Sequence, residues 1–172
     1  WDRTGWEVLI GTIKSLMIGG LLIMKSSRIA VYSGTFDPVS LGHLDLVLRG
    51  RCLFDHLVIG VGENPEKDPL FSVQERVALV TQLVSEYEDI SVKSFRGLTV
   101  NFLKEVDATI LLRGVRSLSD MDQEFTMALA NQALRSEIET VFLTAREEYT
   151  HISSSLTKQI AQMGSKEDVA KF

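Results

Sequence analysis

Cysteine, histidine and proline are scarce in this chain of 172 residues, which contains one cysteine, three histidines and three prolines. The single cysteine, Cys52, excludes an intramolecular disulfide and any metal site built from several cysteines, and it suits a reducing compartment. Basic residues number 18 against 23 acidic ones, so the formal charge of -5 argues against nucleic acid as a main partner. With 45% hydrophobic and 24% charged residues, the composition is typical of one folded globular domain and excludes a disordered chain.

Several well-known functional motifs are also absent. The chain has no G-x-x-x-x-G-K-[ST] sequence, which excludes a P-loop, and Gly60-Val61-Gly62 lacks the third glycine of the dinucleotide-binding fingerprint. No G-x-S-x-G elbow is present, so nothing supports hydrolysis through a covalent serine intermediate. An ordinary kinase, a dehydrogenase and a serine hydrolase therefore do not fit the sequence.

The N-terminal stretch has no apolar run long enough to cross a membrane. Its run over residues 16–24 contains Gly19 and Gly20 and falls short of the roughly 20 residues that a bilayer requires. It also lacks the small-residue cleavage site of a secretory signal, so we expect a cytoplasmic protein with no membrane partner. Helical spacing of apolar residues predicts a short helix over 6–18. The alternative, which we favour, is that 1–23 form a leader or extension outside a single domain spanning 24–172, with Met24 as the natural start.

From residue 28 onward, short apolar runs alternate with helical patterns. The apolar runs predict strands over 29–33, 57–61, 90–95, 109–112 and 140–143. The 3.6-residue periodicity predicts helices over 42–54, 73–84, 98–105, 119–134 and 153–163. This alternation is typical of the α/β class, here a Rossmann-like, doubly wound, five-stranded parallel sheet with helices on both faces. Cys52 falls on the apolar stripe of its helix, so we expect it in the core.

Ligands of such sheets bind outside the carboxyl ends of the strands, so the loops there should carry the chemistry. The first loop reads GTFDPVSLGH and places Ser40, Gly42 and His43 at the start of a helix, where unpaired N–H groups favour an anion. A histidine at this position can donate a hydrogen bond to a phosphoryl oxygen as negative charge develops. The alternative is an ordinary helix N-terminus with a solvated histidine.

Two arginines, Arg113 and Arg116, follow the fourth strand and flank Gly114. Guanidinium groups bind phosphate oxygens in bidentate fashion, although these two could instead neutralise acidic residues in the next helix. If they gather with His43 and Lys67 around one cleft, they would concentrate positive potential in an acidic protein. Three serines, 153–155, begin the last helix and offer further donors. Together these groups suit in-line transfer of a nucleotide, in which positioning and charge neutralisation dominate catalysis.

Four segments, GTFDPVSLGHLD, NPEKDPLF, LLRGVRSLSDMDQEF and HISSSLTKQIA, resemble bacterial phosphopantetheine adenylyltransferases of the nucleotidylyltransferase superfamily in order and spacing. The resemblance covers residues 28–164. It implies transfer of the adenylyl group of ATP to 4'-phosphopantetheine with Mg2+, giving dephospho-coenzyme A and pyrophosphate. The attack would be direct and in line, without a covalent intermediate. The resemblance also implies a homohexamer and feedback inhibition by coenzyme A.

By position in these motifs, the resemblance assigns catalytic roles to His43, Lys67 and Arg113. His43 would stabilise the transition state at the ATP α-phosphate, while Lys67 and Arg113 would bind the acceptor phosphate and Lys67 would also reach ATP. The implied acceptor-binding residues are Thr35, Lys67, Leu98, Thr99 and Arg113. The implied ATP-binding residues are Thr35, Phe36, Ser40, Gly42, His43, Gly114, Arg116, Glu124, Tyr149, Thr150, His151, Ile152, Ser153, Ser154 and Ser155. No residue is assigned to a metal.

The chain departs from the family pattern at a few positions. Ser40 stands where threonine or histidine is usual, Leu41 replaces a polar residue and Ser33 replaces a proline, while the chain ends at Phe172, short of the usual C-terminal segment. Ser40 keeps a hydroxyl, so we expect activity to be retained. His151 also departs from the usual aromatic or polar residue, and we expect it to lie at the surface, as we do the remaining histidine at position 56.

Two alternatives remain open at this point. One is a related enzyme that acts on nicotinate mononucleotide or uses CTP on a polyol phosphate, against which the RGVR sequence and the spacing of Lys67 argue. The other is a nucleotide-binding regulator without catalytic activity, suggested by the changes at Ser40 and Leu41.

Overall fold

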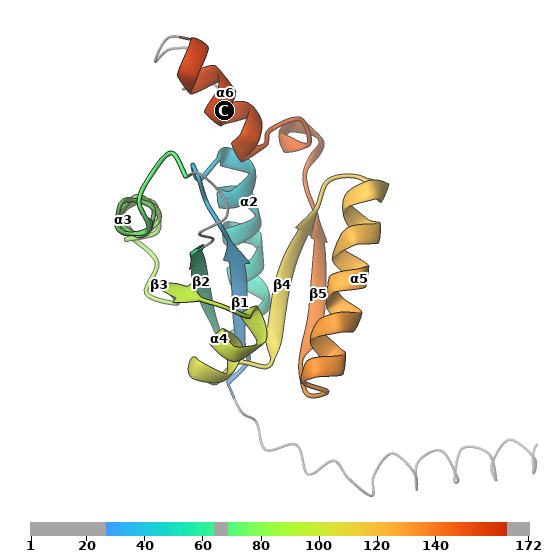
Figure 1. Cartoon of the computed structure of the whole chain (residues 1–172). Coiled ribbons are helices and arrows are strands. Elements are labelled where there is room, and N and C mark those ends of the chain that lie inside the picture. Colours follow the sequence, from blue (N-terminus) through green and yellow to red (C-terminus); the bar gives the residue numbers. More distant parts are fainter. Residues whose placement is uncertain (1–26, 64–68, 165–172) are drawn as a thin grey trace, which may run out of the picture.

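The computed structural model describes residues 27–63 and 69–164 (Figure 1). Several predictions fall outside these residues: the helix over 6–18, the extension over 1–23, the start at Met24, and Lys67.

The described residues form a five-stranded parallel sheet, as the sequence predicted. The strands are β1 (Ile29–Gly34), β2 (His56–Glu63), β3 (Ile90–Arg96), β4 (Ile110–Val115) and β5 (Glu139–Thr144). Their spatial order is β3-β2-β1-β4-β5, and every neighbouring pair is parallel. The chain therefore winds outward from β1 in one direction and then in the other, which places the topological switch point between β1 and β4.

The predicted helices are present, and they cover both faces of the sheet. They are α2 (Leu41–Gly50), α3 (Val73–Leu83), α4 (Thr99–Glu105), α5 (Leu118–Leu134) and α6 (Ser154–Met163), with short 3-10 helices η1 (Arg51–Leu53) and η2 (Glu147–Tyr149). Figure 1 shows α2 on one side of the sheet and α4 on the other, and α6 beyond the carboxyl ends of the strands. Among the residues so described, no helix is long and apolar enough to cross a membrane.

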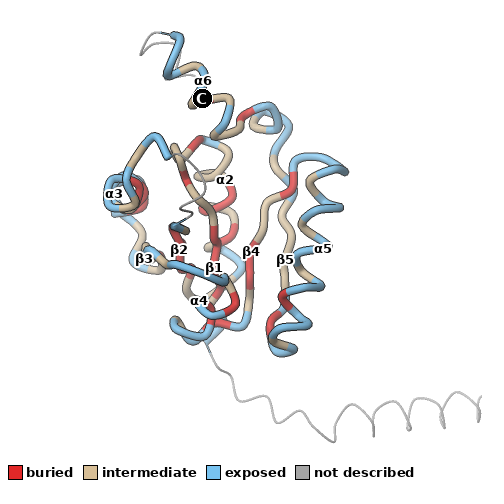
Figure 2. The backbone as a smooth tube through the Cα atoms, in the orientation of Figure 1, coloured by how far each residue is buried: buried red, intermediate tan, exposed pale blue. Residues whose placement is uncertain are grey.

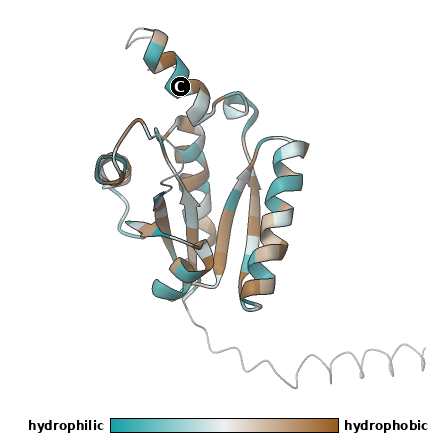
Figure 3. Cartoon of the chain, in the orientation of Figure 1, coloured by the Kyte–Doolittle hydropathy of each residue, from teal (hydrophilic) through white to brown (hydrophobic). Residues whose placement is uncertain are grey.

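Two hydrophobic clusters form the core, one on each face of the sheet. Successive strand residues point to opposite faces, so Tyr32 packs with Leu46 and Val80 of α2 and α3, whereas Val31 packs with Phe102 of α4. Figure 2 shows the buried residues concentrated on the central strands, and Figure 3 shows hydrophobic residues along β4 and β5. The continuous apolar runs of the sequence reflect this burial on both faces.

The prediction of a single helix over 42–54 with a buried Cys52 was wrong. The α-helix ends at Gly50, and the chain continues as η1, in which Cys52 is exposed. A 3-10 helix has three residues per turn rather than 3.6, so the apolar periodicity of α2 does not extend into it. At Gly50 the helix backbone packs closely against β4, because a Cβ there would lie 2.5 Å from Leu112 Cδ2.

Candidate active site

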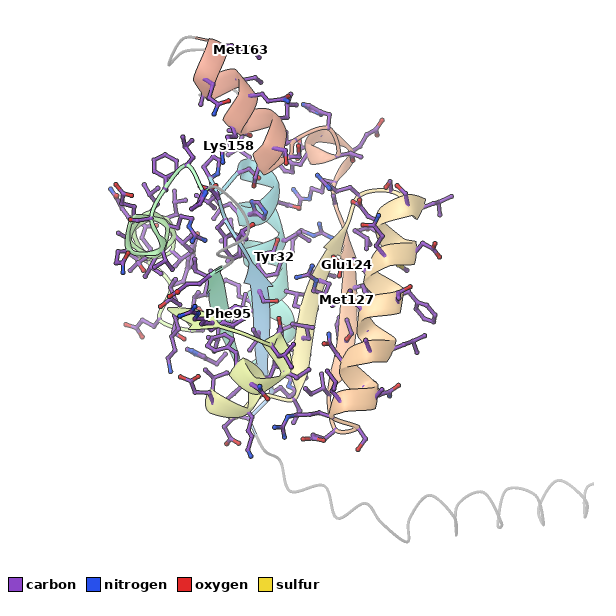
Figure 4. All side chains as sticks on the ribbon, in the orientation of Figure 1. Tyr32, Phe95, Glu124, Met127, Lys158 and Met163 are labelled. Atoms are coloured by element: carbon purple, nitrogen blue, oxygen red, sulfur yellow. The ribbon has the colours of Figure 1, made fainter. Side chains whose placement is uncertain are left out.

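The loops after all five strands open onto one cleft at the carboxyl edge of the sheet. The cleft has a volume of about 1050 Å³, and its lining includes residues of β1 and β4, the two strands at the switch point. Figure 4 labels three of its lining residues, Tyr32, Phe95 and Glu124, on β1, β3 and α5. Open parallel sheets bind their ligands at this position.

The cleft brings together most of the residues that the sequence singled out. Those that line it are Thr35, Ser40, Gly42, His43, Leu98, Thr99, Arg113, Gly114, Arg116, Glu124, Tyr149, Ile152, Ser153, Ser154 and Ser155. Three expected ATP-binding residues do not line it: Phe36 is buried, and Thr150 and His151 are exposed. Of the predicted site residues, Lys67 alone lies outside the residues that the structure describes.

The hydrogen bonds of His43 fix which ring nitrogen carries the proton. The backbone N–H of Ser40 donates to His43 Nδ1 at 3.1 Å, and the Ser40 Oγ lies 2.9 Å from the same nitrogen. A backbone N–H can only donate, so Nδ1 is unprotonated and Nε2 carries the proton of the neutral ring. Ser40 at the N-cap and His43 three residues later thus form a capping box at the start of α2.

The environment of His43 keeps its ring uncharged at neutral pH. Burial, and then the charges of Arg116 and Arg113, lower the pKa of His43 from 6.5 to about 4. His43 therefore offers an N–H donor rather than a positive charge.

Two aromatic rings, those of Phe36 and Tyr32, pack near the His43 ring. The Phe36 ring meets the His43 ring edge to face, with centroids 5.1 Å apart, and the Tyr32 ring lies 6.4 Å away. Phe36 is 2% exposed, so it supports His43 instead of lining the cleft. Burial raises the pKa of the Tyr32 hydroxyl, which keeps that group neutral as well.

Two of the cleft arginines, Arg113 and Arg116, are each held by an acidic residue of α5. Arg113 donates from Nε and Nη2 to the two carboxylate oxygens of Glu124, at 2.7 and 2.5 Å, and from Nη1 to the Ser33 carbonyl at 2.6 Å. Burial alone would lower the pKa of Arg113, but hydrogen bonds to Glu124 and its charge raise it. Arg116 pairs with Asp120 at 2.9 Å. The arginines therefore do pair with acidic residues of the next helix, as one of the two predictions held. Both members of each pair nevertheless line the cleft.

The N-terminus of α6 closes the cleft opposite the sheet. Ser153 caps the helix by accepting a hydrogen bond from Leu156 N at 3.1 Å. The Ser154 hydroxyl donates to the Pro38 carbonyl at 2.8 Å, which ties α6 to the first loop. Lys158, which Figure 4 labels on α6, adds an ion pair to Asp37 at 3.5 Å.

Sequence reasoning missed several residues of this region. Arg96 and Gln123 line the cleft, and Arg96 could have been identified because it begins one of the five loops at the carboxyl ends. Buried Arg76 donates hydrogen bonds to backbone carbonyls next to the cleft. Its signal in the sequence was a charged residue on the apolar stripe of α3, between Val73 and Val80.

The acidic groups of the cleft do not form a ready-made metal site. Within residues 27–63 and 69–164, no three histidine, cysteine or acidic side chains gather as metal ligands would. Asp120 and Glu124 are each engaged by an arginine. A divalent cation would fit this cleft as the partner of phosphate oxygens, which is how Mg2+ commonly binds in proteins.

Comparison with known proteins identifies the family. The model of the cytidylyltransferase-like family matches residues 31–160. The phosphopantetheine adenylyltransferase of Rhodopirellula baltica is 47% identical over 155 residues, which cover 90% of this chain and 84% of that protein. The phosphopantetheine adenylyltransferase of Carboxydothermus hydrogenoformans is 46% identical over 137 residues, covering 80% of this chain and 85% of that protein.

A solved structure supports the same fold. The bifunctional NMN adenylyltransferase/ADP ribose pyrophosphatase of Francisella tularensis superimposes with a TM-score of 0.62 at 12% identity, over 83% of this chain and 44% of that one. The family match and the sequence identities above, independently of this superposition, show that the chain belongs to the cytidylyltransferase-like family and, within it, to the phosphopantetheine adenylyltransferases.

Proposed function

We propose that the cleft binds ATP and 4'-phosphopantetheine side by side, so that the adenylyl group can pass from the first to the second. The protein transfers the adenylyl group of ATP to the acceptor phosphate, giving dephospho-coenzyme A and pyrophosphate in coenzyme A biosynthesis. The observation that carries the site assignment is the meeting of a neutral His43 donor, Arg113, Arg116 and the start of α6 in one cleft. This convergence also argues against a purely regulatory nucleotide site, because it supplies donors for a transition state.

In the proposed mechanism, an oxygen of the acceptor phosphate attacks the α-phosphorus of ATP. A P–O bond to the acceptor forms as the bond to the bridging oxygen of pyrophosphate breaks, and the electron pair leaves with pyrophosphate. The acceptor phosphate is already ionised near pH 7, so no protein base has to remove a proton. Nε2–H of His43 donates to the α-phosphoryl oxygen, where negative charge increases in the transition state.

The other residues of the proposed site bind and orient the two substrates. We assign Arg113, Thr35 and Lys67 to the acceptor phosphate, and Leu98 and Thr99 to the pantetheine arm. The proposed ATP-binding set is Gly42, Gly114, Arg116, Tyr149, Ile152 and the backbone N–H groups of Ser153, Ser154 and Ser155. Because Glu124 grips Arg113 in a bidentate pair, it contributes by fixing that guanidinium.

Mg2+ would enter with ATP as its phosphate complex. Its contribution would be to neutralise part of the triphosphate charge.

We further propose a cytoplasmic homohexamer inhibited by coenzyme A, which contains the product within its structure. The described surface supports assembly through α5, where Leu118, Met121, Phe125 and Leu129 follow helical spacing and are exposed. A continuous apolar stripe of this kind is typical of an interface between subunits.

The first test is pyrophosphate release by the purified full chain with ATP, Mg2+ and 4'-phosphopantetheine. Parallel reactions contain nicotinate mononucleotide or glycerol 3-phosphate as acceptor, and CTP in place of ATP. Release with ATP and phosphopantetheine alone is the expected result. Release with another acceptor would overturn the acceptor assignment, and ATP binding without any release would favour a regulator.

A further inference from the structure

Arg76 is unusual because it is a buried charge in a helix that otherwise presents valines to the core. Among the described residues it is the one charged residue that is buried, at 3% exposure, and it lies on the α3 stripe with Val73, Val77 and Val80. The part of the chain that the structure describes offers it no carboxylate partner in an ion pair. An apolar residue would be cheaper to bury at this position, so the guanidinium requires an explanation.

The guanidinium joins three backbone segments through their carbonyl oxygens. Nη1 donates to the Thr35 carbonyl at 2.5 Å and to the Gly62 carbonyl at 3.0 Å, while Nε donates to the Phe71 carbonyl at 3.1 Å. Thr35 belongs to the loop after β1, Gly62 lies near the end of β2, and Phe71 precedes α3. Arg76 thus connects the cleft-lining segments that follow β1 and end β2, through the carbonyls of Thr35 and Gly62.

The residue after Thr35 has a backbone conformation that must be held in place. Phe36 has φ +49, the left-handed region that is unfavourable for a side chain with a Cβ. Such conformations persist where the surrounding contacts fix them. Arg76 fixes the carbonyl on one side of Phe36, and on the other side the Asp37 carboxylate accepts from Leu70 N and Phe71 N at 2.8 and 3.0 Å.

Arg76 and Asp37, the two residues that hold the backbone on either side of Phe36, both bind the backbone of Phe71. The Phe71 carbonyl is bound by Arg76 and its N–H by Asp37, so Arg76, Phe71, Asp37 and Thr35 form a closed set of contacts around Phe36. The Phe36 ring in turn supports the His43 ring edge to face.

We propose that Arg76 is a positioning residue, which holds the left-handed Phe36 and thereby sets the orientation of His43. The chain of effect runs from the guanidinium to the Thr35 carbonyl, from there to the Phe36 ring, and finally to the imidazole. The link from His43 orientation to turnover rests on the function proposed above. The link from Arg76 to His43 orientation stands on geometry alone.

The histidines allow a direct test, because the chain has only three of them. In the full-length protein labelled at histidine, the NMR signal of the His43 ring reports its distance and angle to the Phe36 ring. We expect Arg76→Met to shift this signal while the other two histidine signals stay in place. Turnover should fall by on the order of tenfold to a hundredfold, mainly in kcat, since misplacement of a transition-state donor affects kcat. Arg76→Lys keeps the charge but not the planar set of guanidinium donors. It should restore part of the wild-type His43 signal and part of the turnover.

Arg51 provides the matched control. It also makes three hydrogen bonds through a guanidinium, but all of them go to Asp89 at the opposite end of the sheet. Arg51→Met should lower stability without moving the His43 signal or changing kcat. If Arg76→Met does not fold, Asp37→Asn removes charge from the other residue that holds the backbone beside Phe36 and should shift the same His43 signal.

The proposal is overturned if folded Arg76→Met, or Asp37→Asn in its place, keeps the wild-type His43 signal. It is also overturned if Arg51→Met reproduces the loss of kcat. Failure of the proposed function would look different: the wild-type protein would release no pyrophosphate, yet the His43 signal would still respond to Arg76.

Discussion

The protonation of His43 gives the sharpest prediction, because it separates a neutral donor from a cationic one. Burial, Arg116 and Arg113 lower its pKa from 6.5 to about 4, so the ring should stay neutral throughout the range from pH 8 to pH 5.5. An NMR titration of the histidine-labelled protein should show the His43 signal changing only near pH 4. The ¹⁵N shifts should identify Nδ1 as the unprotonated nitrogen, since it accepts from Ser40 N.

The same pKa has a consequence for stability, and its sign is fixed. Above pH 6.5 both the folded and the unfolded chain carry a neutral His43. As the pH falls toward 4, the unfolded chain takes up a proton that the folded chain excludes, so stability is lost. With a folded pKa of about 4 against 6.5, the loss between pH 7 and pH 4.5 amounts to about 2 kcal/mol. His43→Gln lacks this contribution, so urea unfolding of both proteins at the two pH values measures it.

The catalytic counterpart is the loss of the donor itself. His43→Ala should keep the fold and lower turnover by on the order of a hundredfold or more, as for other lost transition-state donors. His43→Gln carries an uncharged N–H donor and should retain more turnover than alanine. A His43 titration midpoint near 6.5 would refute the neutral-donor argument, and near-normal turnover of His43→Ala would refute the catalytic role.

Three further substitutions test other parts of the cleft and surface. Arg113→Gln should raise KM for phosphopantetheine more than for ATP and should cost about 2 kcal/mol in urea unfolding, because Glu124 loses its bidentate partner in a half-buried site; equal KM changes would contradict the assignment to the acceptor. Gly114→Ala should lower stability by about 1–3 kcal/mol, because the new Cβ would clash with the buried Leu46 side chain; an unchanged Tm would contradict this packing. Phe125→Glu should reduce the mass measured by light scattering while secondary structure is kept, whereas an unchanged mass would exclude this face of α5 from the assembly.

The fold was predictable chiefly because its central strands, β1, β2 and β4, are buried on both faces, whereas the edge strands β3 and β5 are more exposed. Strands covered by helices on each side must be apolar at nearly every position, so such a strand appears in the sequence as a short continuous apolar run. The spatial order of the strands was not specified by any such run, because it depends on which helix covers which face. Cys52 shows the limit of periodicity: nothing in its spacing signals that the α-helix changes to a 3-10 helix at Arg51.

The sequence predicted most of the residues that line the cleft, but not how their side chains pack and pair with one another. Residues that follow parallel strands meet at one edge of the sheet, so His43, Arg113 and the serines of α6 could be expected together. The burial of Phe36 could not, because it depends on a left-handed backbone that the sequence GTFDP does not reveal. The pairing of Arg113 with Glu124 was one of two open possibilities, and the structure shows this pairing, while phosphate binding by Arg113 stays a prediction.

In the part of the cleft that the structure describes, which does not include Lys67, basic side chains do not outnumber acidic ones. Within the described residues, its wall carries three arginines, at positions 96, 113 and 116, and three carboxylates, at positions 63, 120 and 124, while His43 is neutral. Two of the arginines are tied to two of those carboxylates. The described wall therefore favours phosphates less through net charge than through donors fixed in direction: the guanidinium forks, the imidazole Nε2–H and the N–H groups that begin α2 and α6. Fixed donors of this kind need little rearrangement when charge moves onto the α-phosphoryl oxygen, which is where a transferase of this type gains its rate.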